Sequence, residues 1–327
     1  MKKIKWGIIG CGDVTEKKSG PAFNKVSNSM LVAVMRRNAD KAKDYAQRHN
    51  VPKWYTNGDD LINDPEVNAV YIATPPSSHE MYCIAAINAG KPVYVEKPMS
   101  NNTAEAWKMA NLAAQKNVPL AVAHYRRQQP FFKKIKQLIE DEIIGAVHFV
   151  QLQYCKKALT ATELMDKRIA WRVDPSVAGG GLFHDLAPHQ LDLMHYFFGE
   201  AATVHGVATN NAGLYAADDT VAGNILFKNG VVFNGIWSFG IAAAAERDWC
   251  EITGSRGTIG FSVFDGRTIT ITINDETEQI TFDALQHVQQ PMIAAVVEYF
   301  SGGTENPCSA QDGALIMQWM EAMTRNS

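Results

Sequence analysis

Short apolar runs alternate with helical patterns over residues 1–125, and this alternation limits the fold more than any other feature of the sequence. The runs are apolar at nearly every position rather than at every second one. Strands of this kind are typical of a parallel sheet that helices cover on both faces. Residues 1–125 are therefore predicted to form a doubly wound α/β domain. The runs are Ile4–Ile9, Leu31–Met35, Val70–Ala73, Val93–Val95 and Leu120–Ala123.

Beyond about residue 125 the pattern changes to strand-like runs joined by turns that contain glycine and asparagine. Such turns are expected in an antiparallel sheet. One helix, Leu182–Phe198, lies between the runs, and two helical stretches close the chain. The runs are Val147–Tyr154, Thr203–Ala208, Thr220–Phe227, Val231–Phe239, Trp249–Thr253, Thr258–Ser262 and Thr268–Ile273.

A chain of 327 residues is long for one domain, because an ordinary domain has about 150 residues. We predict two domains, residues 1–125 and residues 126–327. The second is an α+β domain built on an open antiparallel sheet, with the C-terminal helix able to pack back on the first domain. We expect a homodimer or a larger assembly through that sheet. Apolar runs such as 231–233 can make its open face apolar enough to bind a second copy of the chain. The alternative is that these runs fill the domain's own core.

Composition argues against several kinds of partner. Lys plus Arg number 31 and Asp plus Glu number 34, a formal net charge of −3, so neither nucleic acid nor a membrane is expected as a partner. The five cysteines are scattered without CxxC spacing, and no metal site is expected. No apolar stretch approaches the ~20 residues of a membrane span, and the first apolar run is too short for a signal peptide. We expect a cytoplasmic protein.

A glycine-rich loop directly follows the first strand. One glycine permits a sharp turn, and a second lets backbone N–H groups approach a pyrophosphate at a helix N-terminus. The alternative is a tight structural turn, but the position after the first strand favours dinucleotide binding. Gly20-Pro21 predicts that the helix after the loop is short or broken. The predicted cofactor-binding residues of the loop are Gly10, Cys11, Gly12, Asp13, Val14 and Thr15, where Thr15 replaces the usual Gly or Ala.

The end of the second strand bears on the choice of dinucleotide. An acidic residue there would bind the ribose 2′-OH and favour NAD. The strand instead runs into Arg36-Arg37-Asn38, without a carboxylate. A guanidinium can pair with a 2′-phosphate, whereas the alternative is two solvated arginines in a loop. NADP(H) is therefore favoured, and NAD(H) remains possible.

Two further segments give the chain a resemblance to a known family. One is Ala73-Thr74-Pro75-Pro76-Ser77-Ser78-His79, and the other is Val95-Glu96-Lys97-Pro98. Together with the glycine loop and the helix that follows Gly179-Gly180-Gly181, they make nearly the whole chain similar to the Gfo/Idh/MocA oxidoreductase family. The resemblance implies a Rossmann domain, a nicotinamide dinucleotide and a small-molecule substrate.

The resemblance also implies roles for individual residues. Lys97 matches the lysine of the family's Glu-Lys-Pro motif, which lies beside the nicotinamide and the reacting oxygen. His189 matches the catalytic histidine, and Asp185 matches the acidic residue one helical turn before it. The further cofactor contacts that it implies are Thr74, Pro75, His79, Glu96, Lys97, Trp171 and Arg172. The substrate contacts are Lys97, Tyr125, Asp185 and His189, with Tyr125 in place of an Asn found in many members.

The residues themselves agree with these roles. Asp185 and His189 are four apart, so they share one face of a helix that is otherwise apolar. Polar groups in such a place are costly unless they are satisfied or line a cleft, and a structural His–Asp network is the alternative. Lys97 lies just past the C-terminal end of a parallel strand, where ligands bind in open α/β sheets; the alternative is a surface lysine. Asp192 is expected to be structural, and His184 and His195, which fall on other faces of the helix, are expected to be non-catalytic.

These observations lead to one functional hypothesis and two alternatives. The hypothesis is reversible hydride transfer between NADP(H) and a secondary alcohol/ketone pair of a sugar, cyclic polyol or related compound. His189 would move the proton, Lys97 would polarise the carbonyl, and Asp185 would hold a substrate hydroxyl or orient the histidine. The first alternative is redox-neutral, glycosidase-type chemistry with tightly held NAD. The second is a non-catalytic NADP-binding regulator.

Overall fold

The computed structural model describes residues 3–324, which divide into two compact units. Unit 1 comprises residues 3–129 and 285–317, and unit 2 comprises residues 130–284 and 318–324. Unit 1 therefore takes in a segment from late in the sequence as well as the N-terminal part of the chain. The predicted domains, 1–125 and 126–327, stay a prediction.

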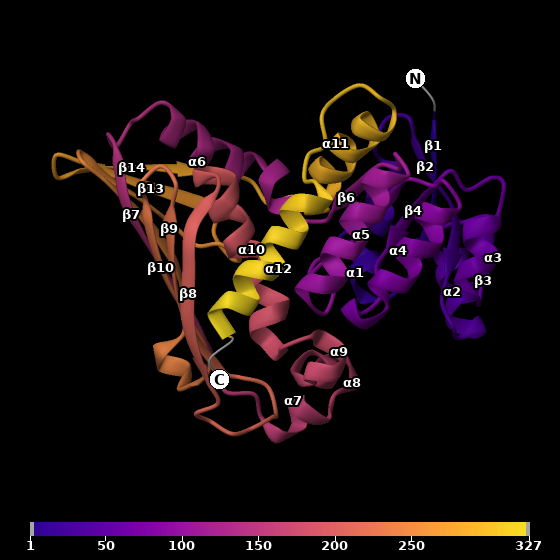
Figure 1. Cartoon of the computed structure of the whole chain (residues 1–327), viewed down its shortest axis with the longest axis horizontal. Helices are drawn as coiled ribbons and strands as arrows, with labels where there is room; N and C mark the ends of the chain where they lie inside the picture. Colours follow the sequence, from indigo (N-terminus) through magenta and orange to yellow (C-terminus); the bar gives the residue numbers. More distant parts are fainter. Residues whose placement is uncertain (1–2, 325–327) are drawn as a thin grey trace. The chain divides into compact units, whose positions relative to one another are not determined.

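Unit 1, which includes the indigo-to-purple N-terminal part of Figure 1, contains a six-stranded parallel sheet with the order β3-β2-β1-β4-β5-β6. This is the order of a doubly wound dinucleotide-binding sheet, as the sequence predicts. The strands are β1 (Ile4–Ile9), β2 (Ser29–Met35), β3 (Lys53–Tyr55), β4 (Ala69–Ile72), β5 (Val93–Val95) and β6 (Leu120–Val122). The helical segments are α1 (Asp13–Lys17), η1 (Gly20–Asn24), α2 (Ala39–Arg48), α3 (Gly58–Asn63), η2 (Pro76–Ser78), α4 (His79–Asn88), α5 (Thr103–Gln115), η3 (Tyr125–Gln128) and α11 (Gln290–Phe300).

The core of unit 1 lies on both faces of this sheet. Every residue of β4, β5 and β6 is buried, as expected of strands covered on both faces. An aromatic cluster fills part of the core, with Tyr71 and Tyr94 stacked at 5.1 Å between ring centroids and Phe23 5.2 Å from Tyr71. Phe300 of α11 joins the cluster through Trp6. The late segment is thus part of the same core.

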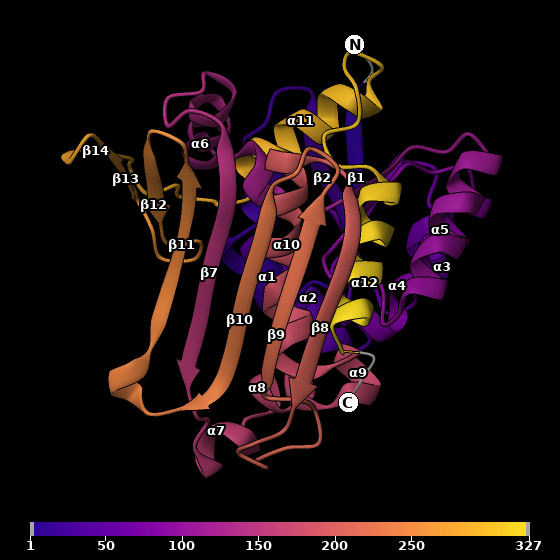
Figure 2. The same ribbon diagram turned by 60° about the vertical axis from the view of Figure 1, so that its left-hand side comes forward.

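Unit 2 contains an eight-stranded sheet with the order β14-β13-β12-β11-β7-β10-β9-β8 (Figure 2). Its neighbours are antiparallel except for β7 and β10, which pair in parallel, so the sheet is mixed rather than wholly antiparallel. The strands are β7 (Val147–Lys157), β8 (Ala201–Thr209), β9 (Thr220–Phe227), β10 (Val232–Ile241), β11 (Arg247–Gly254), β12 (Gly257–Phe261), β13 (Thr268–Ile273) and β14 (Glu276–Thr281). The helical segments are α6 (Pro130–Glu140), α7 (Ala161–Met165), α8 (Lys167–Ala170), η4 (Trp171–Val173), α9 (Pro175–Ala178), α10 (Gly181–Phe198) and η5 (Ala243–Ala245), while α12 (Ala310–Thr324) begins in unit 1 and ends in unit 2.

One face of the unit 2 sheet carries its core. Buried and exposed residues alternate along β9 and β10, which is typical of a sheet with one covered face. On the covered face, Trp237 of β10 contacts Phe183 of α10 at 5.2 Å between ring centroids. Phe261 of β12 contacts Phe132 of α6, and Phe227 of β9 contacts Trp319 of α12. These helices therefore close one side of the sheet.

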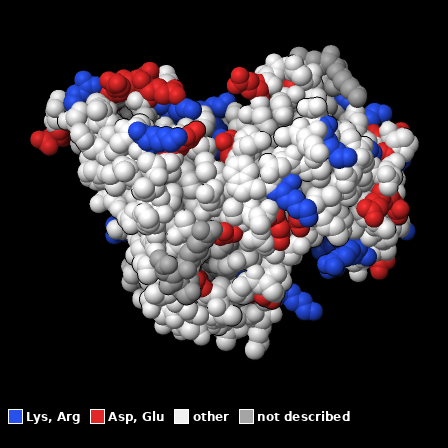
Figure 3. Space-filling model, viewed as in Figure 1, with Lys and Arg blue, Asp and Glu red and all other residues white. Residues whose placement is uncertain are grey.

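Charged side chains of both signs are interspersed on the face drawn in Figure 3, without a broad area of one sign. This fits a chain in which acidic and basic residues nearly balance. Within residues 3–324, none of the helices has the length and apolar character that crossing a membrane requires.

Candidate functional site

The glycine loop after β1 contains two glycines with different constraints. Gly10 has φ +92°, and a Cβ there would lie 2.8 Å from the backbone nitrogen of Thr74. Gly12 has ordinary extended backbone angles, and a Cβ there would meet only the Gly10 carbonyl oxygen, at 3.9 Å. Gly10 is thus required by the packing of β1 against the loop after β4. Gly12 leaves open space beside the loop, as the close approach of a pyrophosphate requires.

Thr15 is fully buried, and the loop itself accommodates its hydroxyl group. Thr15 Oγ1 donates to the Gly12 carbonyl oxygen at 2.8 Å, and the Tyr45 hydroxyl donates to the Thr15 carbonyl oxygen at 2.8 Å. The unusual residue at this position therefore braces the turn. Helix α1 ends at Lys17, and a separate 3-10 segment begins at Gly20, which confirms the predicted short helix.

Arg36 leaves the end of β2 and turns back to the glycine loop. Its Nη1 donates to the Cys11 carbonyl oxygen at 3.1 Å, while Arg37 is exposed. The Cys11 side chain is fully buried, and this burial raises the pKa of its thiol to about 11. Cys11 is therefore protonated near neutral pH, and its contribution to the loop is its backbone.

The loop after β4 is pinned by His79, whose side chain has no exposed surface. Its Nε2 lies 2.7 Å from the Thr74 carbonyl oxygen, and its Nδ1 lies 3.0 Å from the Pro98 carbonyl oxygen. Burial lowers the pKa of His79, while the carbonyl contacts act in the opposite direction. The ring ties Thr74 in the loop after β4 to the segment after Lys97, so the observed role of His79 is to hold two loops together. Pro75 of the first loop is exposed.

Lys97 lies two residues past the end of β5 and is half-buried. Its backbone N–H donates to Oε2 of Glu96 at 3.2 Å. Oε1 of Glu96 accepts from the Tyr71 hydroxyl at 2.5 Å and from Nε2 of Gln289 at 2.7 Å. Glu96 is therefore the centre of a buried hydrogen-bond network. Tyr125, also in unit 1, is the buried first residue of η3, with the Arg126 guanidinium 5.6 Å from its ring centroid.

Unit 2 brings three of the predicted residues together. Nη1 of Arg172 lies 2.5 Å from Oδ2 of Asp185, and the same guanidinium lies 4.9 Å from the Trp171 ring centroid. The side chains of Arg172 and Asp185 are 33% and 10% exposed, so this ion pair is partly desolvated. Asp185 is thus held by Arg172 from the segment that precedes the triple glycine.

His189 lies one helical turn after Asp185 and is buried, with its ring 5.6 Å from the Phe264 ring between centroids. The neighbouring His184 is also buried, and this burial lowers its pKa to about 4. The triple glycine makes room within unit 2 itself. A Cβ at Gly180 would lie 2.0 Å from Nδ1 of His184, and one at Gly181 would lie 2.5 Å from the Ala217 side chain.

The predicted site residues thus fall into two groups, one in each unit. At the C-terminal edge of the unit 1 sheet, the structure gathers the loops after β1, β2, β4 and β5. In unit 2 it gathers Trp171, Arg172 and Asp185, with His189 on the next turn. Sequence reasoning missed Gln289 and Tyr71 because their partner Glu96 is 193 and 25 residues away, and no local pattern joins them.

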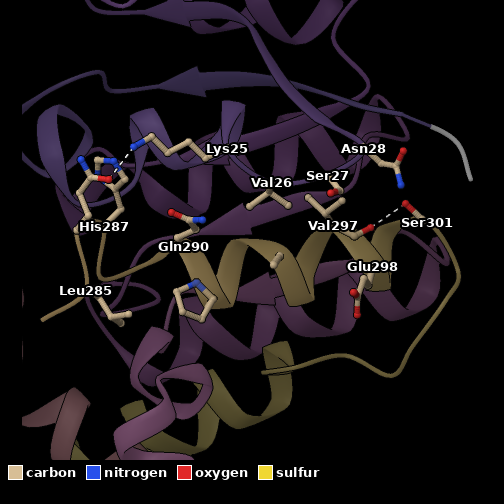
Figure 4. A pocket seen from close by; sticks show the side chains of 13 residues that line it. Lys25, Val26, Ser27, Asn28, Leu285, His287, Gln290, Val297, Glu298 and Ser301 are labelled. Carbon is tan, nitrogen blue, oxygen red and sulfur yellow. Dashed lines mark hydrogen bonds between the residues drawn. The ribbon is translucent and has the colours of Figure 1, made fainter. Parts of the chain in front are cut away.

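A groove of about 560 Å³ lies elsewhere in unit 1, between α11 and the segment before β2 (Figure 4). Its lining includes Lys25, Asn28, His287, Gln290, Glu298 and Ser301, and none of the predicted site residues. In the part of the chain that the structure describes, no three His, Cys, Asp or Glu side chains are grouped as a metal site.

Both parts of the chain match models of one family. Residues 4–124 match the model described as an oxidoreductase family with an NAD-binding Rossmann fold, and residues 132–260 match the GFO/IDH/MocA C-terminal domain. The chain belongs to the Gfo/Idh/MocA family of oxidoreductases. The predictions of this family, of an oxidoreductase and of a Rossmann fold joined to a mostly antiparallel sheet are thereby confirmed.

Named relatives agree with this assignment. An oxidoreductase from Formosa agariphila is 47% identical over 321 residues, covering 98% of this chain and 98% of that protein. A 1,5-anhydro-D-fructose reductase from Ensifer adhaerens is 25% identical, covering 94% and 92%. The structure of a levoglucosan dehydrogenase in complex with NADH has a TM-score of 0.86 and 22% identity, covering 98% of this chain and 95% of that one.

The loop residues fit a dinucleotide, which the family description implies. The open space at Gly12 is where a pyrophosphate would approach the backbone, and the loop lies at the point where the strand order reverses between β1 and β4. The residues that would hold it in unit 1 are those of the glycine loop, Arg36 and the loop after β4.

Proposed function

We propose that this chain transfers a hydride between NADP(H) and a secondary alcohol/ketone pair on a sugar, cyclic polyol or related compound. The observation that carries the proposal is the edge of the unit 1 sheet. The open glycine loop follows β1 and Lys97 follows β5 at this edge. Only β4 separates these two strands, so they lie about 10 Å apart. The names of two similar proteins, a 1,5-anhydro-D-fructose reductase and a levoglucosan dehydrogenase, support the substrate class.

The preference for the 2′-phosphate rests on Arg36. The Cys11 carbonyl holds its guanidinium beside the loop, and one of its five N–H donors makes that bond. A phosphate can accept two parallel N–H bonds from such a group, which a ribose hydroxyl cannot match. Directly after β2 stands Arg36-Arg37-Asn38, which carries no carboxylate to select the hydroxyl instead. NAD(H) remains the alternative, since the levoglucosan dehydrogenase structure contains NADH.

The chain's own residues would manage charge and protons. A bound nicotinamide supplies the hydride chemistry itself. The Lys97 ammonium stabilises negative charge that develops on the substrate oxygen during reduction. The His189 imidazole donates a proton to that oxygen during reduction and removes it during oxidation. Asp185, which Arg172 holds in place, orients a substrate hydroxyl or the histidine.

The decisive experiment is a fluorescence titration of the chain with NADPH and NADH, followed by a screen of sugars and cyclic polyols with the preferred one. Arg36→Asp should weaken NADPH binding far more than NADH binding, because it removes the phosphate partner and adds a like charge. Lys41→Asp, an exposed change of the same charge on α2, serves as the control. Equal loss for both dinucleotides contradicts the choice of cofactor. Sugar release without net cofactor conversion indicates redox-neutral chemistry, and binding without turnover indicates a regulator.

We also propose that the chain forms a homodimer through the open face of the unit 2 sheet. Large apolar side chains on this face are between 36% and 54% exposed. Val232 pairs with both Phe149 and Leu226 across neighbouring strands, so the three lie in one row. Ile236 and Val207 lie in a second row, because both pair with Ala222. Two apolar rows on one sheet face suit a self-complementary interface.

Sedimentation velocity tests the dimer. Val232→Lys places a charge in the middle of the first row, where it would be buried in the assembly, and should shift the chain toward monomer. Leu214→Lys, at a large apolar residue that is 41% exposed outside these strands, is the matched control and should not. A wild-type chain that sediments as a monomer at micromolar concentration contradicts this proposal.

A further inference from the structure

The segment His287–Gln289, just before α11, carries interactions that the proposed reaction does not use directly. We call it the strap. The His287 ring donates from Nδ1 to the Lys17 carbonyl oxygen at 2.7 Å, and the Gln289 backbone N–H donates to the Lys18 carbonyl oxygen at 3.3 Å. Both acceptors lie at the end of α1, which follows the glycine loop. The strap is therefore bound to the last residues of that short helix.

The Gln289 side chain binds a second part of the sheet edge. It is 1% exposed and donates from Nε2 to Oε1 of Glu96 at 2.7 Å. The Tyr94 hydroxyl donates to its Oε1 at 3.4 Å. Both the nitrogen and the oxygen of the Gln289 amide are thus hydrogen-bonded. A 180° flip of the amide would exchange the donor for an acceptor at one contact and the acceptor for a donor at the other.

Glu96 links Gln289 to Lys97, because it is hydrogen-bonded to both residues. Glu96 is 6% exposed, so each of its carboxylate oxygens needs a donor from the protein. Gln289 and Tyr71 serve one oxygen, and the Lys97 backbone N–H serves the other. The Tyr71 hydroxyl also lies 3.2 Å from Oγ of Ser19, between α1 and η1. With two donors on one oxygen, the orientation of the carboxylate is fixed, and so is the acceptor that faces the Lys97 amide.

We infer that Gln289 and Tyr71 are positioning residues for Lys97, acting through Glu96, and that the strap keeps the lysine in register with the helix after the glycine loop. This inference rests on the proposed function, in which Lys97 meets the substrate oxygen. Gln289 touches neither substrate nor cofactor in this account. A rotation of the Glu96 carboxylate would release the Lys97 amide and change the direction of the lysine side chain.

The test compares two near-isosteric changes on neighbouring glutamines. Gln289→Met keeps the volume but removes the donor to Glu96, whereas Gln286→Met removes an exposed amide that accepts from Lys25. In chain labelled with ¹⁵N-lysine, the Lys97 amide is assigned by its loss in Lys97→Arg. Its hydrogen exchange should become about tenfold faster in Gln289→Met, while the other lysine amides and Gln286→Met stay as in the wild type.

Kinetics give the second readout. In Gln289→Met, kcat should fall about tenfold with KM for the dinucleotide within about twofold, because a displaced catalytic group lowers turnover rather than cofactor binding. Tyr71→Phe, which removes only a hydroxyl, should change both readouts in the same direction and replaces Gln289→Met if that variant does not fold. Unchanged Lys97 exchange, or an unchanged kcat, in the variant overturns the inference. The exchange readout needs no turnover, so a wild-type chain that is inactive on every sugar defeats only the proposed function.

Discussion

The two units hold their predicted site residues in different ways. In unit 1 the residues follow separate parallel strands, and hydrogen bonds to backbone carbonyls and to one buried carboxylate hold the loops together. In unit 2 the residues lie on successive turns of α10, and one partly exposed ion pair joins that helix to the segment before it. Side chains on loops at strand ends need many partners from distant parts of the chain to hold them in precise positions. A helix obtains the same precision from its own spacing.

The contrast also extends to the glycines. At the unit 1 loop, Gly12 leaves space that the chain does not fill, which suits a ligand. At the entry to α10, the space beside Gly180 and Gly181 is filled by His184 and Ala217. Gly12 of the first motif is therefore open to a ligand, whereas Gly10 of that motif and both Gly180 and Gly181 of the second serve packing. A glycine run alone does not distinguish these two cases.

The largest effect should come from removing one proposed catalytic group from each unit. Lys97→Ala and His189→Ala should each lower kcat by about a thousandfold, because each removes charge stabilisation or proton transfer in the transition state. Steady-state kinetics and dinucleotide titration measure the two quantities separately. Dinucleotide affinity should stay nearly unchanged in His189→Ala. Near-normal turnover in both variants rejects the roles of both residues.

A second prediction concerns the packed helix of unit 2. His184 has its pKa lowered by burial to about 4, whereas an unfolded histidine titrates near 6.5. The unfolded chain therefore binds an extra proton as the pH falls from about 6.5 to 4, so folding stability declines over this window by roughly 3 kcal/mol. In His184→Gln, thermal melts should show a smaller loss of stability between these pH values. The exposed His205→Gln is the control, and an unchanged pH dependence in His184→Gln contradicts the assignment.

A third prediction separates the two glycines of the unit 1 loop. Gly10→Ala should lower the free energy of unfolding by about 2 kcal/mol, because its φ of +92° and the nearby Thr74 nitrogen both oppose a Cβ. Gly12→Ala should leave the melting temperature unchanged and weaken dinucleotide binding about tenfold, because its Cβ would enter the ligand's space. Thermal melts and fluorescence titration measure these effects. The opposite pattern would assign Gly12 to packing rather than to binding.

Much of the fold follows from local patterns in the sequence. The predicted runs Thr220–Phe227 and Thr268–Ile273 coincide with β9 and β13, because alternating apolar residues directly reflect a sheet with one covered face. The edge strand β3 and the strand β14 are not anticipated. The first has three partly exposed residues, and the second, Glu276–Thr281, is mostly polar and exposed. The parallel pairing of β7 with β10 also depends on tertiary packing, which periodicity does not report.

The site is predictable only where its residues form local motifs. The glycine loop and the Glu-Lys-Pro segment each occupy a few consecutive positions, so their chemistry can be recognised before the fold is known. The ion pair of Arg172 with Asp185 spans 13 residues, and the contact of Gln289 with Glu96 spans 193. Contacts of that length are fixed by the fold, and neither residue type nor spacing indicates them.

A double-mutant cycle of Lys97→Ala and His189→Ala tests the central claim of the proposed function, that these two residues act on the same chemical step. If both act as a unit on one transition state, removing the second group after the first lowers kcat only slightly further. The kcat of the double variant should then lie within about threefold of that of the single variant with the lower kcat. If the two losses instead multiply in full, the residues act independently, and the proposed roles of Lys97 and His189 in one hydride transfer are wrong.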